Sequence, residues 1–74
     1  MQLTLDRLPL GQTAVVSRLV FHGNERRRMM DLGSVKGTTI EAVQKSPSGD
    51  PIAYYIRGAV IALRDEDARK IIIH

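Results

Sequence analysis

NERRRMMDLGSVKG, residues 24–37, is the stretch that decides the fold, because it predicts one short helix inside a chain that otherwise resembles a series of strands. Asn24 is a good N-cap, since its side-chain oxygen can accept a hydrogen bond from an unpaired backbone N–H of the first turn. Gly33 suits the position after the last turn, where φ becomes positive. The sequence therefore marks both ends of a helix of about nine residues.

The predicted helix has an apolar face and a charged one. At about 100° per residue, Met29, Met30 and Leu32 lie on one face. The opposite face carries Arg27, Arg28 and Asp31. A helix this short does not persist alone in water, so we expect the apolar face to rest on the strands before and after it.

Five stretches on either side of the helix predict strands. β-branched residues dominate residues 13–21, where adjacent apolar pairs spoil strict alternation and favour a bulge or bend near Ser17-Arg18. Alternation is clean in residues 51–57, which follow a turn at residues 46–51 with two prolines and a glycine. The predicted strands are residues 13–21, 38–45, 51–57, 59–64 and 71–73.

Two short connections complete the predicted architecture. Gly58 allows a tight turn between two strands, and Asp65 can cap a single helical turn before the final strand. Five short strands and one helix in about 70 residues close most economically into a small barrel. We therefore predict a mainly β, SH3-like five-stranded barrel as one domain over residues 1–74, with the helix inserted after the first strand. The terminal isoleucine strand could pair within this barrel or with a neighbour, which leaves a homo-oligomer open.

Composition limits the classes of protein that remain. The 74 residues contain no cysteine, which excludes disulfides and thiolate metal sites, and eleven basic residues against eight acidic ones give a net charge of +3. The N-terminal residues lack a signal-peptide pattern, and the longest apolar run, residues 59–63, is far too short to span a bilayer. We expect a soluble protein, and the lack of cysteine is compatible with a reducing cytosol.

Residues that could carry catalysis or bind a metal are sparse. The two histidines, His22 and His74, match no ligand spacing, and no serine stands in a nucleophile motif. No glycine pattern resembles a phosphate-binding loop. We expect no enzyme, no catalytic or metal-binding residue, no cofactor and no small-molecule substrate.

Binding to another macromolecule is the remaining class. The only aromatic residues are Phe21, Tyr54 and Tyr55, and alternation places Tyr54 inward and Tyr55 outward. One outward tyrosine is less than the several aromatic rings that usually stack bases or bind proline-rich peptides. The arginines are typical of a solvated helix surface and are also candidates for a partner's carboxylates. The candidate partner-binding residues are Arg26, Arg27, Arg28, Met29, Met30 and Val35. Nucleic-acid binding through the basic surface is the alternative.

A set of short motifs gives the chain a family likeness. Leu32-Gly33 is followed by Gly37, a Gly49-Asp50-Pro51-Ile52 hairpin comes next, and Arg57-Gly58 and Ile61-Ala62-Leu63-Arg64 complete the order. As a set over nearly the whole chain, these motifs resemble the FeoA family. Lys36 stands where members of that family commonly carry proline.

The resemblance implies both a fold and a role. The fold would be a small cytosolic SH3-like barrel, related to the C-terminal domain of repressors of the diphtheria toxin repressor type. The role would be that of an accessory protein in bacterial ferrous iron uptake, which binds and modulates the cytosolic part of FeoB, a membrane transporter with a GTP-hydrolysing domain. A metal-responsive regulatory domain is a further alternative, and a metal would then have to be shared between two chains or with a partner.

Overall fold

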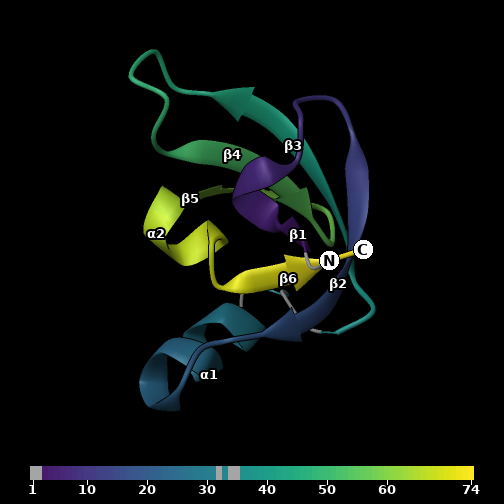
Figure 1. The fold of residues 1–74 in the computed structure, drawn as a ribbon, viewed down its shortest axis with the longest axis vertical. Coiled ribbons are helices and arrows are strands. Elements are labelled where there is room, and N and C mark those ends of the chain that lie inside the picture. The colour runs from purple at the N-terminus through teal and green to yellow at the C-terminus, as the bar shows by residue number, and fades with distance from the viewer. Residues whose placement is uncertain (1–2, 32, 34–35) are drawn as a thin grey trace.

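The computed structural model describes residues 3–31, 33 and 36–74, which form one curved antiparallel sheet with two α-helices (Figure 1). The sheet has six strands in the order β1-β6-β2-β3-β4-β5. The elements are β1 (Leu3–Thr4), the 3-10 turn η1 (Leu5–Arg7), β2 (Thr13–Leu19), α1 (Gly23–Asp31), β3 (Thr39–Lys45), β4 (Ile52–Ile56), β5 (Ala59–Leu63), α2 (Asp65–Ala68) and β6 (Ile71–Ile73). The five predicted strands are present, and the two-residue β1 is an addition that the sequence analysis missed.

The core lies inside the curve of the sheet. Ile40 and Ala42 of β3 share the inner face and are fully buried, as their spacing predicts. In β4 the inner face holds Ile52, Tyr54 and Ile56, which confirms the predicted alternation and leaves Tyr55 outside. Further core residues come from the other strands and from η1, namely Leu5, Val16, Leu63, Ile71 and Ile73.

The bend in β2 divides the strand between two partners. Its first half pairs with β3, its second half pairs with β6, and the register with β6 shifts between Val16 and Arg18. This shift is the bulge predicted near Ser17-Arg18. An extra residue in one strand increases local twist, so the bulge lets β2 serve both parts of the curved sheet.

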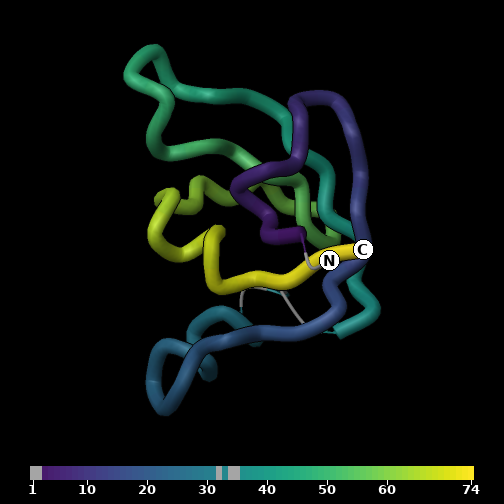
Figure 2. Tube along the Cα trace, in the orientation of Figure 1, coloured from purple at the N-terminus to yellow at the C-terminus, as the bar shows by residue number. Residues whose placement is uncertain are grey.

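The terminal strand β6 is an interior strand of the sheet. It pairs with β1 on one side and with β2 on the other, and Ile71, Ile72 and Ile73 are all buried. The first and last strands, β1 and β6, therefore lie side by side (Figure 2). Because both edges of β6 are paired within the chain, this strand has no edge to offer to a neighbour.

The hairpin between β3 and β4 reaches back to α2. The predicted turn is present, with Gly49 at φ 91°, and Asp50 at its end accepts a hydrogen bond from the backbone N–H of Asp65 at 2.9 Å. The expectation that Asp65 caps the helical turn α2 was wrong, because Arg64 is the N-cap of α2 and makes no side-chain cap bond. The acceptor comes from a residue fifteen positions earlier in the chain, which a local pattern does not reveal.

Helix α1 lies beside the sheet, between β2 and β3 in the chain (Figures 1 and 2). It begins at Gly23, whose φ is 58°, so Asn24 falls in the first turn and not at the predicted cap. Met29 is the buried residue of the helix at 1% exposure, whereas Met30 is 44% exposed. The predicted apolar face was therefore too wide, because the helix contacts the core along a narrow line; Leu32 lies outside the described residues.

Candidate functional site

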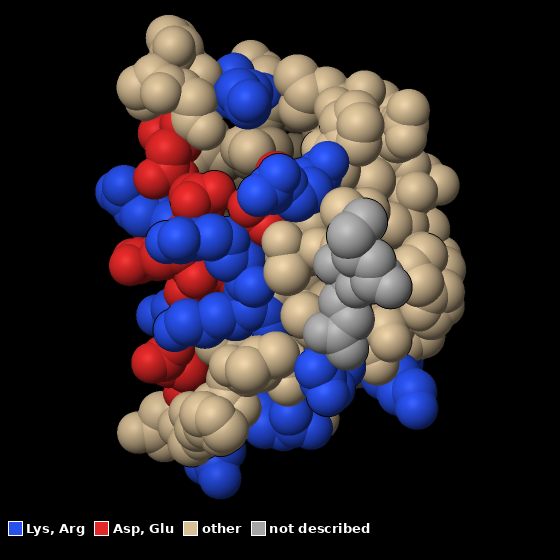
Figure 3. Space-filling model, in the orientation of Figure 1, with Lys and Arg blue, Asp and Glu red and all other residues tan. Residues whose placement is uncertain are grey.

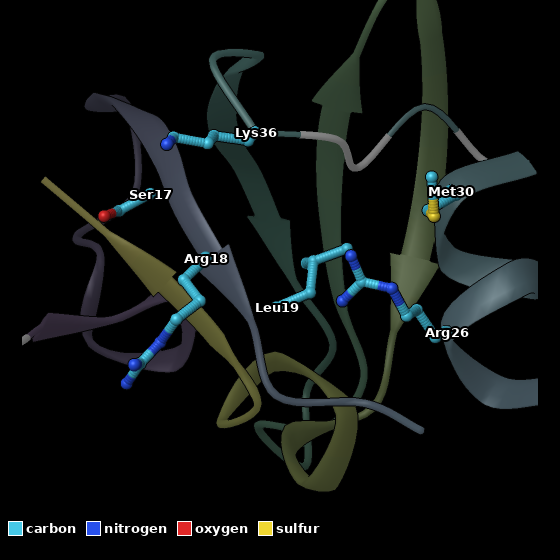
Figure 4. A pocket seen from close by; sticks show the side chains of 6 residues that line it. All are labelled: Ser17, Arg18, Leu19, Arg26, Met30 and Lys36. Atoms are coloured by element: carbon cyan, nitrogen blue, oxygen red, sulfur yellow. The ribbon is translucent and has the colours of Figure 1, made fainter. Parts of the chain in front are cut away.

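A groove of about 320 Å³ runs between the second half of β2 and α1. In Figure 4, Arg26 and Met30 extend from α1 toward β2, Lys36 lies on the far side of the groove from the helix, and the Arg18 guanidinium points away from α1. The lining residues are Ser17, Arg18, Leu19, Arg26, Met30 and Lys36. The groove thus combines cationic side chains with two apolar ones.

Local structure explains why these side chains meet. Arg26 and Met30 are four residues apart on α1, so they are neighbours on one helix face. The β2 residues of the groove follow or form the bulge, where the strand leaves β3 and pairs with β6 alone. The divergence of β3 from β2 provides the space that the groove occupies.

The first turn of α1 contacts the residue that precedes β6. Lys70 Nζ lies 3.3 Å from Glu25 Oε2 and 5.5 Å from the centre of the Phe21 ring. Phe21 is itself buried. An exposed ion pair contributes little stability, but together with the cation–π contact it ties the first turn of the helix to the residue before β6.

The cations of α1 and Lys36 of the groove are available to an external anion. None of the ion pairs formed within the described part of the chain involves Arg26, Arg27, Arg28 or Lys36. Glu25 is already paired with Lys70. In Figure 3 acidic and basic side chains are interleaved on the side of the molecule that carries α2, whereas the charged side chains along the lower edge, where α1 lies, are mainly basic.

The apolar residues of the groove are partly accessible. Met30 is 44% exposed, and Leu19 is half-buried against the core. Methionine adapts to irregular partner surfaces, and an arginine beside it can bind a carboxylate through two donors. The arrangement suits an acidic segment that also carries apolar side chains.

The described residues among the predicted partner-binding set lie in different environments. Arg26 and Met30 lie in the groove, whereas Arg27 and Arg28 are exposed on α1 outside it. Met29 belongs to the core and is too deeply buried to contact a partner. Val35 lies outside the described residues.

Four groove residues were missed by the sequence analysis, namely Ser17, Arg18, Leu19 and Lys36. The predicted bend at Ser17-Arg18 was the available indication that β2 changes direction here. Nothing in the sequence placed that bend against α1, because their proximity depends on the course of the chain around the barrel.

The buried Tyr54 is a structural residue. Burial first, and then the negative charges of Asp6, Asp65 and Asp50, raise the pKa of Tyr54 to about 12. Its hydroxyl donates a long hydrogen bond, 3.5 Å, to the Leu5 carbonyl oxygen. The phenol is therefore neutral at physiological pH and joins β4 to η1.

Across residues 3–31, 33 and 36–74, no three His, Cys, Asp or Glu side chains come together in a group that could hold a metal ion. No helix in this part of the chain combines the length and the apolar character needed to cross a membrane.

Comparison with known proteins identifies the family. The FeoA domain model matches residues 3–74. A Fe(2+) transport protein A/Fe(2+) transporter FeoB fusion protein of Porphyromonas gingivalis (strain ATCC BAA-308 / W83) is 42% identical over 67 residues, which make up 90% of this chain and 8% of that protein. The chain therefore corresponds to a small part of that curated relative.

Solved structures agree in sequence and in fold. Iron(II) transport protein A of Clostridium thermocellum has a TM-score of 0.93 and 36% identity, over 97% of this chain and 44% of that one. A zinc complex of FeoA from Stenotrophomonas maltophilia, described as a prokaryotic SH3 domain protein, has a TM-score of 0.85 and 34% identity, over 97% and 89%. The fold is thus the predicted SH3-like one, and the chain belongs to the FeoA family, which is linked to ferrous iron transport.

Proposed function

We propose that this chain is a non-enzymatic accessory protein of bacterial ferrous iron uptake, which binds and modulates the cytosolic part of a FeoB-type transporter. It would act in the cytoplasm, and its partner surface would be the groove between α1 and β2. The family membership and the fused relative support the partner, because a chain like this one is joined to FeoB in Porphyromonas gingivalis.

One observation supports this choice of surface. Arg26 and Lys36 make no ion pair with a described residue, and the exposed Met30 lies in the same groove. Charged groups that complement a partner raise the association rate, and a central apolar contact slows dissociation. The matching partner surface is an acidic segment with one or more apolar side chains. We place that segment on the GTP-hydrolysing domain of the transporter.

Charge reversal at one position inside the groove and one outside it tests this assignment. Arg26→Glu should weaken binding to the isolated cytosolic domain by about tenfold or more, since it replaces an attraction with a repulsion. Arg28→Glu makes the same charge change on the same helix outside the groove and should weaken binding by less than about threefold. Both side chains are exposed, so both variants should keep the far-UV circular dichroism of the parent chain. Equal losses for the two variants would show that net charge matters and the groove does not.

Met30→Ser gives a second, uncharged probe of the same groove. The side chain is 44% exposed, so the change should alter the free energy of unfolding by less than about 0.5 kcal/mol. Binding should still weaken, because the apolar contact is lost. Unchanged affinity for both Met30→Ser and Arg26→Glu would remove the groove from the proposal while leaving the family assignment intact.

A further inference from the structure

Strand β5 forms one end of the sheet. In the strand order it follows β4 and pairs with β4 along Ile52–Leu63 to Ile56–Ala59. No strand among the described residues pairs with its other edge. The inner-face residue Ile61 is only partly buried at this edge.

The register shows which backbone groups face the open edge. Arg57 and Gly58, with φ of 48° and 87°, form a two-residue turn, so Ile56 and Ala59 make a hydrogen-bonded pair. Such pairs alternate along antiparallel strands, and Ile61 is therefore bonded to Tyr54. The N–H and C=O groups of Val60 and Ala62 consequently point away from β4.

The hydrogen bonds of β3 lead independently to the same orientation of the β4 and β5 backbone groups. The Ala42 N–H and C=O bond to Gln12 and Gly11, on the β2 side of β3. The adjacent Glu41 must then face β4 and bond to Tyr55. Tyr55 thus faces β3, which leaves Tyr54 to face β5.

This edge lacks the features that normally prevent pairing with another chain. Residues 59–63, AVIAL, contain no charge and no proline, and natural edge strands usually carry one or the other. Val60 is 64% exposed and stands on the outer face beside Tyr55, which is 46% exposed. A hollow of about 300 Å³ beside Ala62 is lined by uncharged residues, among them Pro47 and Ala53.

We propose that β5 is a self-association edge, on which a second copy of this chain pairs antiparallel across a two-fold axis through Ile61. Val60 would pair with Ala62 of the partner subunit and Ala62 with Val60 of the partner subunit, and each pair would exchange two backbone hydrogen bonds. The outer faces of the two sheets would then join into one apolar strip.

The charges at the ends of the strand favour a second copy as the occupant. In this register the Arg57 turn of one copy lies opposite Asp65 of the partner subunit, where β5 leads into α2. Asp65 and Glu66 follow Arg64 directly, and Asp65 also pairs with Arg69 of its own chain at 3.2 Å, so each end of the strand carries both acids and bases. A two-fold contact of this kind is self-complementary and needs no other protein.

This inference concerns a different face from the groove and does not depend on the proposed function. The contact is small, so we expect a weak dimer with a dissociation constant of about 1 mM or somewhat tighter. Sedimentation equilibrium over roughly a hundredfold range of concentration up to about 1 mM should show the average mass rising from 8.2 kDa toward twice that value. A constant mass equal to that of the monomer would overturn the proposal.

Two lysine substitutions distinguish pairing at the β5 edge from association through another part of the sheet surface. Val60→Lys places a charge on the edge and should weaken dimerisation by about tenfold or more. Val43→Lys is the matched control, since Val43 of β3 is also exposed, at 43%, but lies two strands away from the edge. If both variants weaken association equally, or if neither does, the edge is not the contact.

Amide exchange identifies the hydrogen bonds directly. The Val60 and Ala62 amides should exchange fast with solvent in dilute samples and become protected as the concentration rises, while the Ile61 amide, bonded to Tyr54, stays protected throughout. In a sample that mixes labelled and unlabelled protein, an intermolecular contact between the Ile61 α-protons of the two copies should appear. Protection of Val60 and Ala62 only when a transporter domain is added would assign the edge to that partner and overturn self-association.

Discussion

Gly33, two residues after the last residue of α1, offers a sharp test of how the helix is held against the sheet. Its φ is 94°, and its N–H donates to the Met30 carbonyl oxygen at 2.9 Å. A Cβ atom added at this position would lie 2.9 Å from Arg57 Cδ and 3.4 Å from Ile56 Cγ2. Gly33→Ala therefore introduces two costs, a left-handed backbone conformation and a crowded contact.

The control is Gly49, which has nearly the same conformation without the contact. Its φ is 91°, and no atom lies within 4 Å of an added Cβ. The left-handed conformation costs alanine about 1–2 kcal/mol at either position. After the gain of about 0.4–1 kcal/mol from the lower entropy of the unfolded alanine chain, a net cost of about 1 kcal/mol remains in both variants. Crowding adds about 1 kcal/mol at Gly33 alone, because Ile56 is buried and only the Arg57 stem can move.

Urea denaturation followed by far-UV circular dichroism measures the difference. Gly33→Ala should lower the free energy of unfolding by about 2 kcal/mol and Gly49→Ala by about 1 kcal/mol, with the same dependence on urea. For a domain of this size, the extra 1 kcal/mol corresponds to about 4–8 °C in the melting temperature. Equal destabilisation of the two variants would refute the packing of Arg57 against Gly33.

Three further predictions concern the core and the cap of α2. The pKa of Tyr54 is raised to about 12 from 10.0, so the folded state keeps its full stability below pH 10 and should lose about 3 kcal/mol of unfolding free energy between about pH 10 and 12. In urea titrations Tyr54→Phe should abolish this loss. A loss that persists in the variant would contradict its assignment to Tyr54. Met29→Ala should cost about 3 kcal/mol because it opens a cavity, whereas Met30→Ala should cost less than about 0.5 kcal/mol; similar losses in thermal unfolding would place both methionines in the core. Asp50→Ala should cost about 1 kcal/mol through the lost bond to the Asp65 N–H, and Asp50→Asn should recover most of it in the same assay, since the amide oxygen can still accept.

The parts of the fold that the sequence predicted are those set by local patterns. The alternation of Ile52, Tyr54 and Ile56 identifies β4 and its inner face, and the proline- and glycine-rich turn fixes the hairpin before it. The run of β-branched residues interrupted at Ser17-Arg18 identifies β2 and its bulge. Each of these features arises from neighbours in the chain, so a single sequence contains them.

The parts that were missed depend on residues distant in the chain. The strand β1 has only two residues and exists because β6 lies beside it, and Asp50 reaches Asp65 only once the hairpin has folded back. Periodicity grouped Met29 with Met30, but the narrow contact of α1 with the core buries only Met29. The groove likewise joins one face of α1 to Lys36 and the end of β2. Helical spacing predicted only the groove residues that lie on α1.

The most direct test of the proposed function is a calorimetric titration of this chain into the isolated cytosolic domain of the FeoB-type transporter from the same organism. The titration is run at two salt concentrations, with an oligonucleotide as the control titrant. We expect saturable binding to the domain that weakens as salt screens the cations around the groove, and no saturable binding to the oligonucleotide. Binding to the oligonucleotide alone, with a steep dependence on salt, would contradict a role at the transporter and assign the basic surface to nucleic acid.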